Sequence, residues 1–147
     1  MNDMRDLYQQ LILDHSKSPR NKGVLENPSG RAVGHNPLCG DRIEVALRLD
    51  GDTITEIKFE GSGCAISQAS ASIMTTVLKG ITTDSAQELF ENFHQMLTGG
   101  GGDKEQLGKL VALADVYKFP VRVKCAMLPW RTLEASLDSQ PTMITTE

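Results

Sequence analysis

The sequence has few cysteines, few aromatic residues and no long apolar run. Its 147 residues include three cysteines, and aromatic residues make up 5% of the chain. No window approaches the run of about 18 apolar residues that a membrane-spanning helix needs, and the first residues are too polar for a signal peptide. An odd number of cysteines cannot form a closed disulfide set. We therefore expect a cytoplasmic protein without a membrane anchor, whose cysteines serve metal ligation or thiol chemistry.

The charge balance also excludes a class of partners. The chain carries 15 basic and 19 acidic residues, a formal net charge of -4, so nothing in its long-range field favours nucleic acid or an anionic membrane. Its 39% hydrophobic and 23% charged residues are typical of a globular protein. The length suits one packed core, and we expect a single domain over residues 1–147.

Two stretches alternate between apolar and polar residues, which is the period of a strand with one buried face. They cover residues 43–49 and 55–59. Between them, Asp50 and Gly51 are turn residues of a tight hairpin, so the two strands should be antiparallel. A third, short strand is expected at residues 31–34.

Five helices are predicted from apolar residues that recur every three to four positions. Ser85 with Glu88 resembles a capping box for the third of them, and Pro129 suits the first turn of the last. The helices cover residues 4–17, 65–78, 86–97, 107–117 and 130–137. The order predicts an α+β fold, a small antiparallel sheet of about three strands covered on one face by helices.

Two segments lack this periodicity. Residues 18–36 are rich in proline, glycine and asparagine, and we interpret them as an ordered surface connection. Residues 139–147 are expected to form a flexible tail.

Each cysteine stands at a predicted element boundary, where a sulfur can point away from a helix or strand interior. Cys39, Cys64 and Cys125 could therefore converge, and Asp41 would add an oxygen. Three sulfurs and one oxygen match the tetrahedral preference of zinc and of some iron sites. The alternative is that each cysteine is a small buried hydrophobe and Asp41 a turn or capping residue. The spacings alone match no local zinc-finger pattern.

Other charged and titratable residues lie near these positions. Arg42, Arg122 and Lys124 are placed to offset the negative charge of a four-anion site, and their alternative is solvated surface charge. His15 and His94 are expected to serve as helix cap or helix-face residues rather than ligands. His35 precedes the first cysteine motif, and its role stays open.

The segments around the cysteines resemble the three motifs of the NifU amino-terminal/IscU family of iron–sulfur cluster assembly proteins. The resemblance covers nearly the whole chain, including residues 7–15. Residues 98–118 resemble an insertion of the SufU branch, and Lys124 stands where IscU-type scaffolds carry histidine. An ammonium group cannot ligate a metal, so this difference favours SufU. The motifs are Asn36-Pro37-Leu38-Cys39-Gly40-Asp41, Gly61-Ser62-Gly63-Cys64-Ala65-Ile66-Ser67 and Val123-Lys124-Cys125.

The resemblance implies a zinc-dependent sulfurtransferase that binds one Zn²⁺ through Cys39, Asp41, Cys64 and Cys125. A SufS-type, pyridoxal-phosphate cysteine desulfurase would donate persulfide sulfur, which passes on to downstream iron–sulfur assembly proteins. We predict Cys39 as the catalytic acceptor, because Gly40 and a proline-containing loop make its segment the most easily displaced.

Two alternatives remain at this point. One is an IscU-like scaffold that assembles a [2Fe-2S] cluster, with iron or the cluster held by the same residues. The other is a structural zinc domain without transfer chemistry, which a site closed to solvent would indicate.

Overall fold

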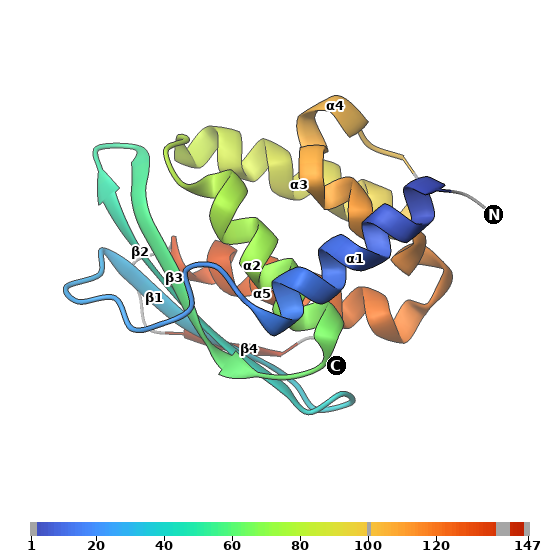
Figure 1. Ribbon diagram of the computed structural model, residues 1–147. Helices are drawn as coiled ribbons and strands as arrows, with labels where there is room; N and C mark the ends of the chain where they lie inside the picture. Colours follow the sequence, from blue (N-terminus) through green and yellow to red (C-terminus); the bar gives the residue numbers. More distant parts are fainter. Residues whose placement is uncertain (1–2, 100, 138–141, 146–147) are drawn as a thin grey trace.

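The computed structural model describes residues 3–99, 101–137 and 142–145. A helix comes first, three strands follow, and further helices and a short strand complete the order (Figure 1). The elements are α1 (Asp3–Lys17), β1 (Gly30–Asn36), β2 (Asp41–Asp50), β3 (Thr53–Ser62), α2 (Ala65–Leu78), α3 (Thr83–Gly99), α4 (Lys104–Leu107), the 3₁₀ helix η1 (Gly108–Lys118), α5 (Pro120–Ser136) and β4 (Thr142–Thr145).

The strands form one sheet with the order β3-β2-β1-β4. β2 pairs antiparallel with both β1 and β3, and β4 pairs parallel with β1. The α+β class and the predicted antiparallel hairpin are confirmed, with a fourth strand added. β4 occupies residues 142–145 of the predicted flexible tail; residues 139–141, 146 and 147 of that tail lie outside the described residues.

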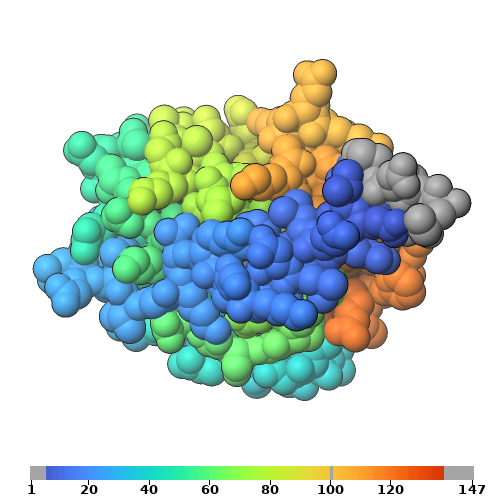
Figure 2. Space-filling model, viewed as in Figure 1, coloured from blue at the N-terminus to red at the C-terminus, as the bar shows by residue number. Residues whose placement is uncertain are grey.

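All the helices of the described chain lie on one side of the sheet. α2 and α5 contact the strands, whereas α1, α3 and η1 form an outer layer that packs on α2 and α5 (Figure 1). In the space-filling view, α1 and the following segment 18–29 run across the face turned to the reader (Figure 2). No helix of the described residues has the length and apolar character that a bilayer crossing requires.

The alternating pattern of the hairpin forms the core face of the sheet. Ile43, Val45 and Leu47 of β2 are fully buried, and Phe59 and Ile57 stand opposite the last two on β3. β1 adds its own inner face, where Gly34 allows α5 to approach closely. A Cβ atom there would lie 2.0 Å from Thr132 Oγ1 and 2.9 Å from a Leu128 methyl. This close packing of β1 on α5 brings the end of the sheet beside the first turns of α5.

The start of the last helix was predicted wrongly. α5 begins at Pro120, which occupies its first turn, and Pro129 lies inside the helix instead. Cys125 therefore stands within a helix rather than at an element boundary. Every residue from 125 to 130 is buried, so this part of α5 shows no polar face and gives no helical period.

Two other helix predictions need correction. The third helix begins at Thr83, and its cap is Thr82, whose Oγ1 accepts the backbone N–H of Ser85 at 3.2 Å; Ser85 is not the cap. The apolar stripe at residues 107–117 belongs mainly to the 3₁₀ helix η1, not to an α-helix. Gly108 separates it from α4 with a φ of +55°, a conformation that an α-helix cannot continue through.

His15 is a buried residue of α1 that holds this helix against α2. The Ser72 hydroxyl accepts the backbone N–H of Arg20 at 2.8 Å, and the same oxygen lies at hydrogen-bond distance, 2.7 Å, from His15 Nδ1. A neutral imidazole suits this arrangement. Burial lowers the pKa of His15, the charges of Arg20 and Lys109 lower it further, and Asp14 opposes them.

The first testable prediction follows from this lowered pKa. The unfolded chain binds a proton at the ordinary histidine pKa of about 6.5, whereas the folded protein resists it, so acidification favours unfolding. We expect the urea midpoint to fall as the pH drops from about 7.5 to 5.5, and to fall less in His15→Asn, whose amide can replace Nδ1. Equal pH slopes in both proteins would contradict this assignment.

Candidate metal centre

The centre begins where the inner face of the sheet ends. Residues 30, 32, 34 and 36 of β1 and residues 41, 43 and 45 of β2 point to the helices, and Asn36 stands opposite Asp41 in the register. Both side chains are fully buried. The turn between them carries Cys39, whose backbone N–H donates to the Asn36 carbonyl at 3.3 Å. The strand period thus places an amide, a carboxylate and a thiol together.

Cys64 reaches the same place from the start of α2, where it is the N-cap residue. Its backbone N–H donates to Asp41 Oδ1 at 2.8 Å. Gly63 makes this approach possible, because a Cβ atom there would lie 2.3 Å from the same oxygen and 2.6 Å from Ser67 Oγ. The carboxylate is therefore fixed by the N-terminus of a helix.

Cys125 comes from the second turn of α5. The Ser70 hydroxyl donates to the carbonyl of the next residue, Ala126, at 2.6 Å and ties α2 to α5 beside the site. Because Pro129 has no N–H, the carbonyl of Cys125 lacks its helical donor four residues ahead. The helices that carry Cys64 and Cys125 are thus joined directly.

Three of the four predicted ligands meet in space. Ligand atoms of Cys39, Asp41 and Cys125 all lie within 4.8 Å of one another. The sulfurs of Cys39 and Cys125 are 2.9 Å apart, and all three cysteines are free thiols. The sulfur of Cys64 falls outside this close set but still acts on the Cys125 thiol. That all four residues ligate one ion stays a prediction.

The buried oxygens of the centre lack donors. Asp41 Oδ2 and Asn36 Oδ1 are both buried without a hydrogen-bond partner, although Asp41 Oδ1 is satisfied. An unsatisfied buried acceptor costs roughly 1–3 kcal/mol. A cation between the carboxylate and the sulfurs would remove this cost at Asp41. The residues present therefore fit a metal ion with sulfur and carboxylate ligands.

Charges around the sulfurs are unevenly distributed. Burial raises the pKa of the Cys125 thiol far above its usual range, and the neighbouring side chains of Cys39, Asp41 and Cys64 raise it further. The pKa of Arg122 is raised, chiefly by the negative charge of Cys64 and by a hydrogen bond to it. Arg122 is therefore the cation of the three predicted that contacts the cysteines.

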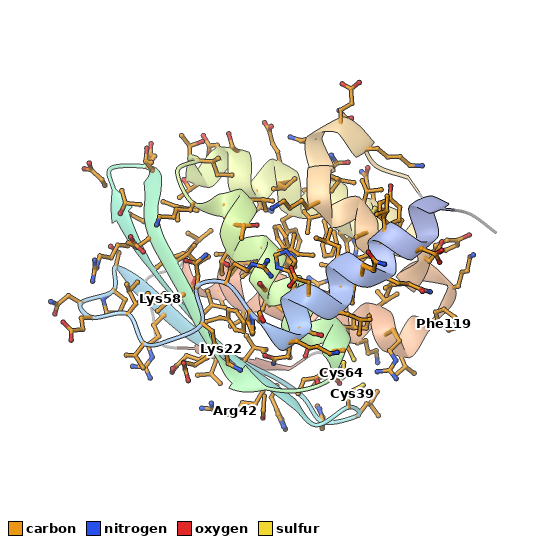
Figure 3. All side chains as sticks on the ribbon, viewed as in Figure 1. Lys22, Cys39, Arg42, Lys58, Cys64 and Phe119 are labelled. Atoms are coloured by element: carbon orange, nitrogen blue, oxygen red, sulfur yellow. The ribbon has the colours of Figure 1, made fainter. Side chains whose placement is uncertain are left out.

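The other two predicted cations and the remaining histidines stand apart from this contact. Arg42 is exposed on the outer face of β2, away from Cys39 and Cys64 in Figure 3, whereas Lys124 is half-buried. His35 is exposed on β1, and the ring of His94 stacks on that of Phe90. None of these histidines belongs to the group of ligand atoms found among the described residues.

The centre is open on one side. Cys39 and Cys64 are half-buried and lie at a hollow of about 610 Å³, whereas Cys125 is fully buried behind them. The other lining residues come from the turn of Cys39 and from the start of α5: Leu38, Lys118, Phe119, Pro120, Val121 and Arg122. Figure 3 shows the two cysteines side by side and Phe119 beyond them. The site is accessible to a partner molecule.

Sequence reasoning missed Asn36 and the exposed apolar residues of this hollow. Asn36 shares the inward parity of Ala32 and Gly34, so the strand period was the available signal. Leu38, Phe119 and Val121 are large apolar residues that remain exposed, and sequence alone gives no burial for residues of this type.

Comparison with known proteins identifies the family of this chain and its relatives. The profile of the family described as the NifU-like N terminal domain matches residues 7–126. The chain belongs to this family. The zinc-dependent sulfurtransferase SufU of Bacillus subtilis (strain 168) is 50% identical over 129 residues, 87% of each chain. The iron–sulfur cluster assembly scaffold protein IscU of Streptococcus pyogenes serotype M1 is 36% identical over 93% of this chain and 86% of the relative.

The fold of this NifU-like chain also matches a solved structure. FiSufU from Fervidobacterium islandicum AW-1 superposes with a TM-score of 0.85 at 41% identity, covering 90% of this chain and 98% of that one. The predicted family, its SufU branch and the IscU/SufU-like fold are confirmed. Whether residues 98–118 are an insertion specific to that branch stays a prediction.

Proposed function

We propose that this protein is a zinc-dependent sulfur acceptor of iron–sulfur cluster assembly, which takes persulfide sulfur from a pyridoxal-phosphate cysteine desulfurase. The observation that supports it most is that Cys39 shares one ligand group with the buried Asp41 and Cys125 and, like Cys64, is half-buried at an open hollow. The SufU relative, at 50% identity, bears the name of this activity. The acceptor would hand its sulfur to downstream assembly proteins.

The donor set fits zinc. Cys39, Asp41, Cys64 and Cys125 offer three sulfurs and one oxygen, and Asp41 Oδ2 has no other partner. When bound, zinc would keep its ligand thiols deprotonated, which is the form that attacks sulfur. Free thiols are kept reduced in the cytoplasm, and we place the protein there.

Cys39 is the cysteine we assign as acceptor. Cys125 is fully buried on α5, and Cys64 is fixed at the start of α2 by its backbone hydrogen bonds. Cys39 lies in a short turn beside Gly40, which has a φ of +70° and open space where a Cβ would stand. Its sulfur can move toward a partner with little rearrangement of the packed elements.

The proposed reaction is thiol–persulfide exchange. The Cys39 thiolate attacks the outer sulfur of the donor persulfide, the donor S–S bond breaks, and the donor cysteine leaves as a thiolate. Cys39 then carries the persulfide, and no net oxidation occurs. Arg122 lines the same hollow and places a cation where the anionic persulfide enters.

The structure bears on both alternatives. A purely structural zinc site is closed over by side chains, whereas this site faces an open hollow. A cluster scaffold gains from a fourth neutral ligand beside the third cysteine, whereas this chain has Lys124 there. Both observations favour transfer.

The test combines metal analysis with mass spectrometry. Protein purified without added iron is expected to be colourless and to carry about one zinc per chain. After incubation with the desulfurase and cysteine, its mass should increase by one sulfur atom, which a reductant removes. A brown protein that binds iron and sulfide without gaining persulfide would favour the scaffold instead.

A further inference from the structure

Asn36 is a buried polar residue that the transfer chemistry does not use. It is the last residue of β1 and has no exposed surface. Its side-chain Nδ2 lies 3.7 Å from Cys125 Sγ, within hydrogen-bond range for sulfur, and its Oδ1 has no partner. A buried amide that is only partly satisfied costs stability, so its presence needs an explanation.

The contacts of Cys125 explain what the amide contributes. In two other contacts the Cys125 thiol is the donor, to the Val121 carbonyl at 3.6 Å and to Cys39 Sγ. Both depend on the single proton of this thiol. A thiolate that ligates a metal has no proton to give, so those two contacts lose their donor. The N–H of Asn36 is directed at the sulfur and remains a donor to the thiolate.

The three sulfurs therefore have different surroundings. Cys64 contacts the Arg122 guanidinium, and the half-buried Cys39 lies at the open hollow. Cys125 is fully buried and interacts with Arg122 more weakly than Cys64 does, and the Asn36 amide is placed where it can stabilise this sulfur as a ligand. Asn36 binds Cys39 through its backbone carbonyl, which accepts the Cys39 N–H at 3.3 Å, whereas its side-chain amide is directed at Cys125.

We propose that Asn36 is a positioning residue of the metal centre, which fixes Cys125 as the permanent ligand and leaves Cys39 as the sulfur free to react. This inference rests on the zinc site of the proposed function and assigns a residue outside the four ligands. Hydrogen-bond partners of ligands commonly change metal affinity by roughly 10- to 100-fold when they are removed. We expect a loss of that size for Asn36→Ala.

The experiment measures the affinity for zinc by competition with a chromophoric chelator, in wild type, Asn36→Ala and Asn36→Asp. Asn36→Asp keeps the shape but replaces the donor with an acceptor, so it should weaken zinc binding at least as much. Cobalt replaces zinc in a second measurement, since its sulfur-to-metal charge-transfer band reports on the ligand thiolates. Both variants should change that band.

Asn92 provides the matched control. It is also a buried asparagine, and its Nδ2 donates to Gln106 Oε1 and the Asp103 carbonyl, remote from the sulfurs. Asn92→Asp should lower the free energy of unfolding of the metal-free protein and leave zinc affinity and the cobalt band unchanged. If an Asn36 variant does not fold, Asn36→Ser makes a smaller change and takes its place.

The outcomes separate the two proposals. Asn36 variants that lose stability but bind zinc and cobalt as wild type does would show a purely structural role and overturn the inference, while the proposed function stands. A wild type that binds no zinc would overturn both. Weakened zinc binding in the Asn36 variants, with Asn92→Asp unaffected, is the expected result.

Discussion

Replacing Cys39 by serine is expected to abolish sulfur uptake from the desulfurase, with a rate loss of more than about 100-fold. Serine keeps the size of the side chain but is a far weaker nucleophile toward sulfur than a thiolate. Cys64 and Cys125 remain in the variant, one capping α2 and the other buried in α5. The measurement is peptide mass spectrometry of persulfide after incubation with the desulfurase and cysteine.

Asp41→Ala is the control for this variant. It removes the carboxylate of the centre and should weaken metal binding, yet it leaves all three thiols and should still accept sulfur on Cys39. If Cys39→Ser gains sulfur on Cys64 or Cys125 at the wild-type rate, the assignment of Cys39 is wrong. If the wild type gains sulfur but neither Cys39→Ser nor Asp41→Ala does, the Asp41 carboxylate is itself needed for transfer, and our assignment of Asp41 as a metal ligand alone is wrong.

Strong local patterns accounted for most of the fold. The alternation at residues 43–49 and 55–59 predicted β2 and β3, because Ile43, Val45 and Leu47 of β2 and Ile57 and Phe59 of β3 are fully buried. Thr55 is exposed instead, beside a shift in the register of the two strands after Arg48. The start of α5 was predicted wrongly because residues 125–130 are all buried and include a proline inside the helix. The strand β4 was not predicted for another reason: it has four residues, and they pair with β1, which lies more than a hundred residues earlier in the chain.

The ligand residues of the candidate site could be predicted from the sequence, whereas the contacts around them could not. Cysteine and aspartate are residues whose chemistry identifies them, and the structure brings Cys39, Asp41 and Cys125 together. Cys125 was expected at a boundary and instead lies within α5, which explains why its sulfur is the buried one. The contacts of Arg122 and Asn36 depend on how α5 and β1 pack, and no local pattern encodes that.

Large apolar residues surround the opening of the centre, and they bear on how a protein donor docks. Leu38, Phe119 and Val121 keep 62%, 59% and 52% of their surface exposed, and all three line the hollow of Cys39 and Cys64. We name these three residues the apolar rim. Exposed apolar side chains gathered around a reactive group are typical of a protein interaction site. A small persulfide would not need them.

Phe119→Ser combined with Val121→Ser is therefore expected to impair sulfur transfer from the desulfurase but not from a small persulfide such as glutathione persulfide. Burying each half-exposed side chain in an interface stabilises it by roughly 1 to 1.5 kcal/mol, so KM for the desulfurase should rise roughly 30- to 150-fold. Sulfur uptake from the small donor should keep its wild-type rate, because the substitutions leave Cys39, Asp41 and Cys125 unchanged.

Val24→Ser is the matched control for the apolar rim. Val24 is 76% exposed, and it lines a separate hollow with Arg31 and Lys58. Figure 3 shows Lys58 at the opposite end of the molecule from Phe119. This variant should leave both donors unaffected. If the rim variant slows both donors equally, the rim supports the site itself; if it slows neither, the donor docks elsewhere, and in both cases the docking assignment is wrong.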